Sequence, residues 1–383
     1  MFLTDIAANQ EQLKDNIAGK NILVIGGAGT IGSSFIKAIL PFRPGALYVV
    51  DYSENGLTEL TRDLRSAYNE FIPATYITYP FDFGSEIFKK FFRKNSFDTV
   101  ACFAAHKHVR SEKDHLAIEA MIRNNVFNTK QLLDLALENR PENFFSVSTD
   151  KAANPVNVMG ASKKVMEKVL LAYTDELKIS TARFANVAFS NGSLLYGFIE
   201  RMMKRQPISA PSDVKRYFVS PEESGQLCML ACMLGKTTDI FFPKLDATQM
   251  LTFSAIAEDF LKSVGLEPDY CQSDDEAREK AKNWQLGDKK YPVSFFKTDT
   301  SGEKSFEEFF TNKDSVDMNT FNALGIVKNS DIRPKKAIVE MLKDFENLFV
   351  SSSINKAKVV ALLNEYLPDF KHIETGKSLD QKM

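Results

Sequence analysis

Side chains able to transfer protons lie together in one short stretch of the sequence. Thr149, Asp150 and Lys151 directly follow the run FFSVS, so a hydroxyl, a carboxylate and an amine stand at the end of an expected strand. In the helix pattern that follows, Met159 and Lys163 are four residues apart and share one face. In a closed pocket, desolvation raises the pKa of an Asp and lowers that of a Lys, which lets neighbouring residues act as general acid and base. The stretch therefore predicts an acid–base centre, with a surface salt pair or a helix-capping turn as the alternative.

A glycine-rich turn near the N-terminus could hold a dinucleotide. Residues 21–40 form an expected strand, a tight turn with glycines at three-residue spacing, and a helix. Glycines let the backbone approach a pyrophosphate closely, and the free N–H groups and dipole of the helix then face that anion. The expected cofactor contacts in this turn are Gly26, Gly29, Thr30, Ile31 and Gly32.

The ends of the next strands bear on the choice of cofactor. Asp51 ends the strand pattern ALYVVD, nineteen residues after Gly32, where a carboxylate accepts hydrogen bonds from an adenosine ribose. A carboxylate repels a 2′-phosphate, so we favour NAD over NADP. A role as helix cap or turn residue is the alternative for Asp51. We expect Asp82 near the adenine edge, and the small residues Ala104 and Ala105 where bulk would block the dinucleotide.

Strands and helices alternate through the first half of the chain. Further strand patterns occur at 74–83, 97–105 and 144–150, and helical patterns at 85–94, 115–139 and 160–176. This alternation predicts an α/β fold with a Rossmann-type, doubly wound parallel sheet.

Composition and charge exclude several classes of protein. The 383 residues are 44% hydrophobic, enough for a large core, and the 48 basic and 50 acidic residues give no overall attraction to nucleic acid or anionic membrane. No run approaches the roughly 20 apolar residues of a membrane span, and the first residues do not resemble a signal peptide. The four cysteines and the pair His106 and His108 lack the spacing of a metal site. We expect a cytoplasmic protein without a metal.

The motifs together resemble the extended short-chain dehydrogenase/reductases. The glycine turn, Asp51, FAAHKHV and STDKAANPVNVMGASK carry this resemblance. Within the superfamily the chain looks most like the nucleotide-sugar 4,6-dehydratases that act on UDP-N-acetylglucosamine in bacterial polysaccharide and glycan biosynthesis. The similarity runs from about Gly19 to Met250 and resumes in TSGEKSFEEFF at 300–310.

The resemblance implies a role for each residue of the acid–base stretch. In that family the position of Thr149 lies near the sugar C4 hydroxyl, while Asp150 acts as acid at C6 and Lys151 as base at C5. Lys163 holds the nicotinamide ribose and lowers the pKa of its catalytic partner. The substrate contacts implied in the same way are Lys107 and His108 at the sugar, and Asn186 and Arg216 at the nucleotide diphosphate.

Met159 departs from the superfamily pattern. A short-chain dehydrogenase has a tyrosine at this position, whose phenolate takes the alcohol proton. A thioether cannot accept or donate a proton. The site is therefore either catalytically inactive or uses another group to carry the proton of the alcohol. Our hypothesis is that Thr149, with Asp150 or a water, replaces the tyrosine hydroxyl.

The resemblance also implies a function and a domain organisation. It implies NAD-dependent 4,6-dehydration of a nucleotide hexose, with UDP-N-acetylglucosamine as the expected substrate, to a 4-keto-6-deoxy sugar by a homo-oligomer. A 4- or 5-epimerase and a catalytically silent NAD-binding protein stay open, as do the nucleotide base, the C2 substituent and the outcome at C5. The predicted domains are an NAD-binding domain at 1–186, to which segments near 215–250 return, a discontinuous mixed α/β nucleotide-sugar lobe at 187–330, and a helical tail at 331–383.

Overall fold

The chain folds into two compact units. The structure, a computed structural model, describes residues 1–67, 71–304, 306–328 and 332–376. The first unit comprises residues 1–184, 222–244 and 308–372, and the second comprises 185–221, 245–307 and 373–383. Each unit is thus assembled from segments far apart in the sequence. Residues 331 and 377–383 of the predicted tail lie outside the described residues.

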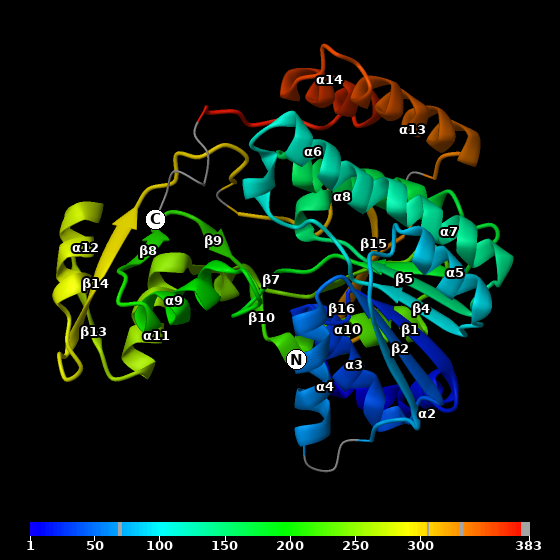
Figure 1. The fold of residues 1–383 in the computed structure, drawn as a ribbon, viewed down its shortest axis with the longest axis horizontal. Coiled ribbons are helices and arrows are strands. Elements are labelled where there is room, and N and C mark those ends of the chain that lie inside the picture. Colours follow the sequence, from blue (N-terminus) through cyan, green and yellow to red (C-terminus); the bar gives the residue numbers. More distant parts are fainter. Residues whose placement is uncertain (68–70, 305, 329–331, 377–383) are drawn as a thin grey trace. The chain divides into compact units, whose positions relative to one another are not determined.

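A nine-stranded sheet forms the centre of the first unit (Figure 1). Its strands β3, β2, β1, β4, β5, β6 and β11 are parallel, and β16 and β15 continue it in antiparallel pairing at the edge beside β11. Because β1 pairs with both β2 and β4, the strand order reverses there, as in a doubly wound sheet. The strands are β1 (Asn21–Ile25), β2 (Ala46–Asp51), β3 (Thr75–Pro80), β4 (Thr99–Cys102), β5 (Asn143–Val147), β6 (Ile179–Ala182), β11 (Ile240–Pro243), β15 (Ser315–Asp317) and β16 (Leu324–Lys328).

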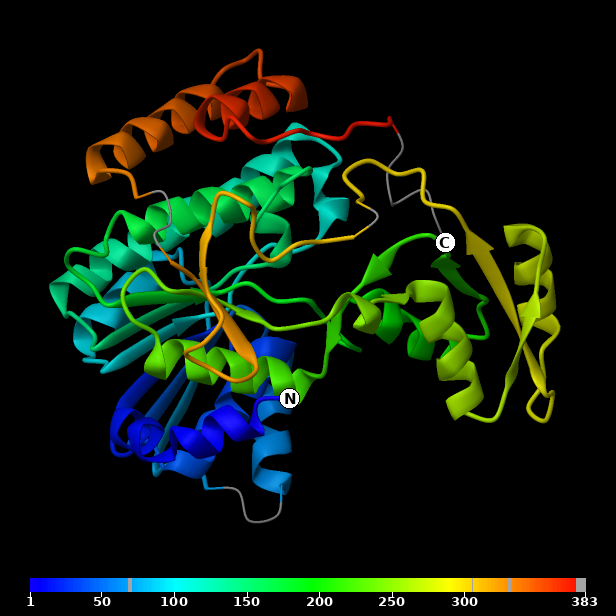
Figure 2. The same ribbon diagram turned by 180° about the vertical axis from the view of Figure 1, so that it is seen from behind.

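Helices cover both faces of this sheet, with α3 and α10 on one side and α5, α7 and α8 on the other (Figures 1 and 2). This arrangement confirms the predicted Rossmann-type fold. The helices are α1 (Leu3–Ala8), α2 (Gln10–Ile17), α3 (Thr30–Ile39), α4 (Glu54–Ser66), α5 (Glu86–Lys94), α6 (His115–Ile122), α7 (Asn128–Glu138), α8 (Val158–Leu171) and α10 (Pro221–Leu234).

The helical pattern at 115–139 is interrupted in the structure. A π-helical turn, Arg123–Phe127, separates α6 from α7. It contains Asn125, which is 1% exposed and exchanges hydrogen bonds with the backbone of His106 (2.8 and 3.0 Å) while donating to Ser162 Oγ of α8 (3.0 Å). A widened turn of this kind often accommodates a functional side chain. Here it ties the loop after β4 to α8.

Two C-terminal helices belong to the first unit. The helices α13 (Lys335–Phe349) and α14 (Lys356–Tyr366) contact each other, α13 contacts α8, and α14 contacts α6 (Figure 1). The buried Ile338 and Phe345 of α13 share one apolar cluster with Val165 and Val169 of α8. The predicted helical C-terminal region is therefore present, and it supports the helix that carries Met159 and Lys163.

The second unit has its own sheet and core. Strands β13, β14 and β8 pair in parallel, and two short ladders join β7 to β10 and β9 to β12. Phe198, Leu261 and Tyr291 are among the fully buried side chains at its centre. Its elements are β7 (Asn186–Val187), α9 (Leu194–Met203), β8 (Ile208–Pro211), β9 (Lys215–Arg216), β10 (Phe218–Val219), β12 (Leu251–Thr252), α11 (Phe253–Ser263), β13 (Glu267–Tyr270), α12 (Asp274–Asn283) and β14 (Lys290–Phe296). Among the helices of the described residues, none has the length and apolar character that crossing a membrane requires.

Candidate functional site

The glycine turn between β1 and α3 forms a tight cradle. Gly26 has a φ of +76°, and a Cβ there would lie 2.5 Å from the backbone nitrogen of Ala104, just beyond β4. A Cβ on Gly32 would lie 2.3 Å from the carbonyl oxygen of Gly26. The first helical residue is Thr30, and Gly29 precedes it as N-cap without a side-chain cap. The first N–H groups of α3 lie next to a turn without side-chain bulk, an arrangement that fits a pyrophosphate.

Asp51 lies beside this turn at the end of β2. Its carboxylate accepts hydrogen bonds from the backbone N–H of Ala28 (3.0 Å) and of Ser53 (2.9 Å). Ser53, not Asp51, caps α4, because the Ser53 hydroxyl accepts from the N–H of Gly56 (3.1 Å). Asp51 therefore has the turn role named as its alternative, at the place where a ribose contact is expected. Asp82 is exposed after β3 and accepts from the N–H of Gly84 (2.7 Å).

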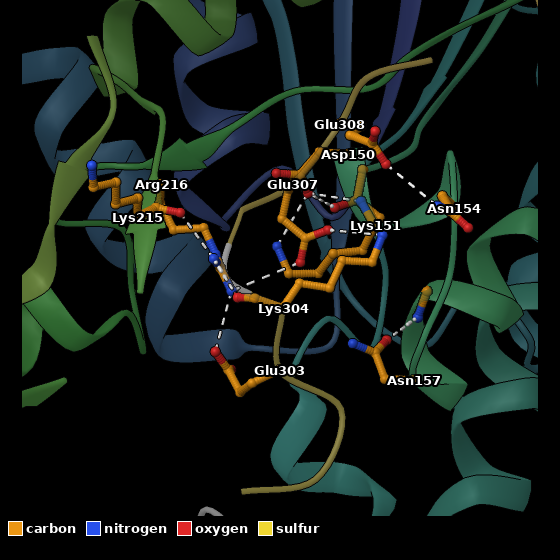
Figure 3. Close-up of polar contacts among 12 residues, drawn as sticks. Asp150, Lys151, Asn154, Asn157, Lys215, Arg216, Glu303, Lys304, Glu307 and Glu308 are labelled. Atoms are coloured by element: carbon orange, nitrogen blue, oxygen red, sulfur yellow. Dashed lines mark hydrogen bonds and ion pairs between the residues drawn. The ribbon is translucent and has the colours of Figure 1, made fainter. Parts of the chain in front are cut away.

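The predicted acid–base residues form one hydrogen-bonded cluster after β5, of which Figure 3 labels Asp150 and Lys151. Asp150 Oδ1 accepts from the Thr149 hydroxyl (2.8 Å), the Lys151 backbone N–H (2.8 Å) and Lys151 Nζ (3.1 Å). The side chains of Asp150 and Lys151 are 3% and 16% exposed. The pair is thus largely removed from solvent, and three donors that converge on one oxygen suit a carboxylate anion.

Neighbouring strands fix the backbone of this turn. The N–H of Ser148 donates to the carbonyl of Ala182 at the end of β6 (2.8 Å), and the N–H of Asp150 donates to that of Phe184 (3.4 Å). Asp150 then begins a short 3₁₀ turn that ends at Ala152. The sheet register therefore continues into the turn and sets where the Asp150 carboxylate lies.

Met159 and Lys163 lie one turn apart on α8, and both are buried, at 3% and 4% exposed. Lys163 Nζ donates to the carbonyl of Val147, the last residue of β5 (2.7 Å), and to the Met166 sulfur (3.0 Å). Burial lowers the pKa of Lys163 to about 8, although the nearby Cys102 and Glu167 raise it in part. The lysine expected to hold the nicotinamide ribose therefore lies at the end of the strand that carries the acid–base turn.

The backbone around Met159 has a partner that the sequence did not reveal. The N–H of Met159 donates to Glu112 Oε1 (3.1 Å), and the other carboxylate oxygen, Oε2, lies 3.5 Å from Nε2 of His372. Glu112 is 7% exposed. A carboxylate at the first turn of α8 complements the positive end of the helix dipole. This contact joins the segment before α6 and the C-terminal segment to the start of α8.

A buried ion pair behind the turn was also not predicted. Glu167, one helical turn after Lys163, accepts from the Ser148 hydroxyl (2.6 Å) and is bonded bidentately by Arg183 (2.8 and 2.7 Å). The only signal in the sequence was the four-residue spacing between Lys163 and Glu167, which puts both on one helix face. Nothing in the sequence indicated that Arg183 would reach Glu167.

The predicted sugar contacts of the first unit follow β4. Lys107 and His108 are exposed side chains in the loop that leads to the 3₁₀ turn Val109–Glu112. Partial desolvation lowers the pKa of Lys107, and it lowers that of His108 together with the positive charges of Lys107 and Arg110. Within the described residues, no three His, Cys, Asp or Glu side chains are grouped so as to hold a metal ion.

The predicted diphosphate contacts lie in the second unit. Arg216 on β9 is 4% exposed, and its guanidinium donates to the carbonyls of Lys215 (2.9 Å) and Lys304 (3.0 Å) and to Glu303 Oε2 (3.1 Å) (Figure 3). Asn186 on β7 has a buried side-chain nitrogen, Nδ2, without a hydrogen-bond partner among the described residues. An unpaired buried donor is costly, so Nδ2 is suited to an acceptor on a ligand.

Three known proteins illustrate what the chain is similar to. It is 33% identical over 260 residues to a Methanocaldococcus jannaschii protein named uncharacterized membrane protein MJ1061, covering 65% of this chain and 74% of that one. It is 28% identical over 241 residues to a UDP-N-acetylglucosamine 4,6-dehydratase (inverting) of Campylobacter jejuni, covering 61% and 69%. The solved structure of DesIV, a dTDP-glucose 4,6-dehydratase of Streptomyces venezuelae with NAD and TYD bound, superposes with a TM-score of 0.57 at 19% identity, covering 76% and 89%. This last similarity shows the fold alone.

The family is established by a longer match. A family model described as polysaccharide biosynthesis protein matches residues 22–329. The matched range starts in β1, before the glycine turn, and includes the acid–base turn, α8 and the sheet of the second unit. With most of its length matched, the chain belongs to the polysaccharide biosynthesis protein family.

Proposed function

We propose that the protein catalyses the NAD-dependent 4,6-dehydration of a nucleotide-activated hexose, with UDP-N-acetylglucosamine as the candidate substrate. The observation that carries the proposal is the largely buried pair of Asp150 and Lys151, joined at 3.1 Å and adjacent to Thr149. Elimination of water needs an acid and a base at neighbouring carbons, and two consecutive side chains can supply both. The similarity to a named UDP-N-acetylglucosamine 4,6-dehydratase supports the same reaction.

The proposed cofactor, NAD, would be held by the glycine cradle, Asp51 and Lys163. When bound, it would take a hydride from the sugar C4 and return it to C6. Asp51 favours NAD because a carboxylate beside the adenosine ribose repels a 2′-phosphate. Lys163 would hold the nicotinamide ribose from its place below the end of β5, where its Nζ already donates to Val147.

The hydrogen bonds of the cluster favour a proton path through Thr149. Its hydroxyl donates to Asp150 Oδ1 at 2.8 Å, so it can take the C4 hydroxyl proton while passing its own proton to Asp150. Asp150 then donates this proton to the departing C6 hydroxyl, which leaves as water. Lys151, neutral at the start, removes the C5 proton and returns it to C5 when C6 is reduced. Every proton is accounted for, and Thr149, Asp150 and Lys151 all end as they began.

This path starts from an ionised Asp150, whereas an Asp150 that acts as the acid without a preceding proton transfer would have to start protonated. The Thr149 hydroxyl and the Lys151 backbone N–H, which both donate to Oδ1, support the ionised starting state, because each of them stabilises negative charge on that oxygen. In the same path Met159 transfers no proton and only fills the space of a tyrosine.

The substrate diphosphate is expected in the second unit. The guanidinium of Arg216 bonds two backbone carbonyls and Glu303, so it would bind a diphosphate by exchanging its contact with Glu303. The unpaired Nδ2 of Asn186 is a further donor. Lys107 and His108 remain the candidate sugar contacts of the first unit. We further propose that the enzyme works as a homo-oligomer in the cytoplasm, with NAD bound by the first unit and the nucleotide by the second. Of the predicted lobe at 187–330, residues 222–244 and 308–328 belong to the first unit.

One incubation tests the proposal. The purified protein is mixed with UDP-N-acetylglucosamine and NAD, and the sugar nucleotide is analysed by mass spectrometry. A product lighter by one water is expected, and NADP in place of NAD should give a slower reaction. An isomer of unchanged mass would indicate an epimerase instead. Unchanged sugar together with bound NAD would indicate a catalytically silent NAD-binding protein, the alternative raised by Met159.

A further inference from the structure

The helix α8 holds the end of β5 at two consecutive residues. Lys163 donates to the carbonyl of Val147 (2.7 Å), and Glu167, one turn later, accepts from the hydroxyl of Ser148 (2.6 Å). Thr149 follows immediately in the chain. The two contacts therefore fix the strand directly before the acid–base turn, from one face of one helix.

Arg183 fixes Glu167 in turn. Its Nε and Nη2 atoms bond the two carboxylate oxygens of Glu167 (2.8 and 2.7 Å), and its Nη1 donates to the carbonyl of Phe309 (2.9 Å). Arg183 directly follows β6, the strand whose backbone also receives the N–H of Ser148. Ser148 is thus held through its backbone and its side chain by adjoining segments of the chain.

The pair of Glu167 and Arg183 is among the most buried charged groups of the protein, at 2% and 1% exposed. Burial alone would raise the pKa of Glu167, but the charge and hydrogen bonds of Arg183 hold it at about 2. Such a pair seldom stabilises a fold more than apolar residues of equal size would, because both charges lose their hydration. What the pair does provide is a fixed direction for its hydrogen bonds, here toward Ser148.

We propose that Glu167 and Arg183 are positioning residues for the acid–base turn, acting through the Ser148 hydroxyl to hold Thr149 and Asp150 where they meet the substrate. The proposal rests on the proposed dehydration. Neither charged side chain transfers a proton in it. A displacement of the turn by about 1 Å is enough to lower the rate by up to roughly 100-fold.

The first test removes only the link. Ser148→Ala leaves the bidentate pair intact and orphans no charge, so the protein should fold and bind NAD as before. We expect kcat of dehydration to fall 10- to 100-fold while KM stays within about twofold, and Ser148→Thr, which keeps a hydroxyl, to recover most of the rate. The matched control is Ser180→Ala, another buried serine of the same unit, which donates to the carbonyl of Ala231 (2.8 Å) and should leave kcat unchanged.

The second test replaces the pair. Glu167→Leu combined with Arg183→Met exchanges two charges for apolar groups, which buried pairs often tolerate. It should lower kcat as Ser148→Ala does, and adding Ser148→Ala to it should cause no further loss, because the hydroxyl then has no partner to lose. The rates of all three variants complete a mutant cycle.

The outcomes separate the two proposals. An unimpaired Ser148→Ala, or losses of kcat that add fully in the combined variant, would overturn the positioning role while the active wild type upholds dehydration. Equal losses in kcat and in affinity for NAD would show a general structural defect and would likewise overturn it. A folded wild type that releases no water from any nucleotide sugar would overturn both.

Discussion

The hydroxyl of Thr149 lies 2.8 Å from Oδ1 of Asp150, and the same oxygen accepts a hydrogen bond from Nζ of Lys151. A substrate proton entering at Thr149 can therefore reach the acid that expels the C6 hydroxyl. We predict that Thr149→Val lowers the rate of dehydration by roughly 100-fold or more, while Thr149→Ser keeps most of it. The measurement is the initial rate of water loss by mass spectrometry. Full activity in Thr149→Val would refute the relay.

Met159 should behave differently from Thr149. Its side chain is buried, and leucine has nearly the same volume, so Met159→Leu should cost less than about 1.5 kcal/mol in stability. We expect kcat to stay within a few-fold of the wild type, measured in the same assay together with the unfolding midpoint. A severe loss of rate in a stably folded Met159→Leu would mean that the thioether does more than occupy space.

Lys163 should make stability depend on pH in the alkaline range. Its pKa is about 8 in the folded protein against an ordinary value of 10.5. Below pH 8 both states are protonated and the cost of burying the charge is present in full. Between pH 8 and 10.5 the unfolded chain binds more protons, so the contribution of Lys163 to the free energy of unfolding rises with pH, by about 3 kcal/mol in all.

Urea unfolding at both ends of this range measures that rise. Lys163→Met should lack it, while tyrosines and cysteines distant from Lys163 that titrate in the same range contribute equally to both proteins and cancel in the difference. An identical pH dependence in wild type and variant would contradict the lowered pKa.

The cradle offers a matched pair of glycine substitutions. A Cβ on Gly32 would lie 2.3 Å from the carbonyl oxygen of Gly26, whereas a Cβ on Gly29 would meet that oxygen at 3.4 Å, an ordinary contact. Gly32→Ala should therefore abolish measurable NAD binding, followed by calorimetry, and lower the thermal midpoint. Gly29→Ala should fold normally, and its NAD affinity reports how closely the dinucleotide approaches the backbone. Tight NAD binding by Gly32→Ala would show that the glycine turn is not the dinucleotide site.

Arg216 should matter for the nucleotide and not for the cofactor. Loss of a charge-assisted hydrogen bond costs roughly 1.5 to 3 kcal/mol, so Arg216→Gln should weaken UDP binding about 10- to 100-fold and leave NAD binding unchanged. Arg278→Gln is the control, because that arginine makes an exposed ion pair with Asp275 on α12 of the same unit. Equal UDP affinity in wild type and Arg216→Gln would exclude the diphosphate contact.

The sequence was sufficient to predict the parallel sheet of the first unit. Strand patterns alternate with helical patterns through the first half of the chain, so a parallel sheet is the simple solution. The proximity of residues on one turn or one helix, such as Thr149 to Lys151 and Met159 with Lys163, was predictable for the same reason, since it follows from local geometry.

What escaped prediction depends on contacts between distant segments. The bond from Arg183 to Glu167 exists because β5 and β6 are neighbours and α8 packs against both, which no local pattern encodes. The antiparallel β16 pairs with β11 across some eighty residues of chain that mostly belong to the other unit. The π-helical turn at Asn125 arises from bonds to His106 and Ser162, whereas the helical periodicity on either side continues without a visible break.

The packing of α13 against α8 has a consequence for biosynthesis. The apolar side of α8 is completed by Ile338 and Phe345, which leave the ribosome more than 160 residues after that helix does. Throughout this interval Val165 and Val169 lack these two packing partners in the nascent chain. The helix that carries Lys163 therefore reaches its final packing only after α13 has been synthesised.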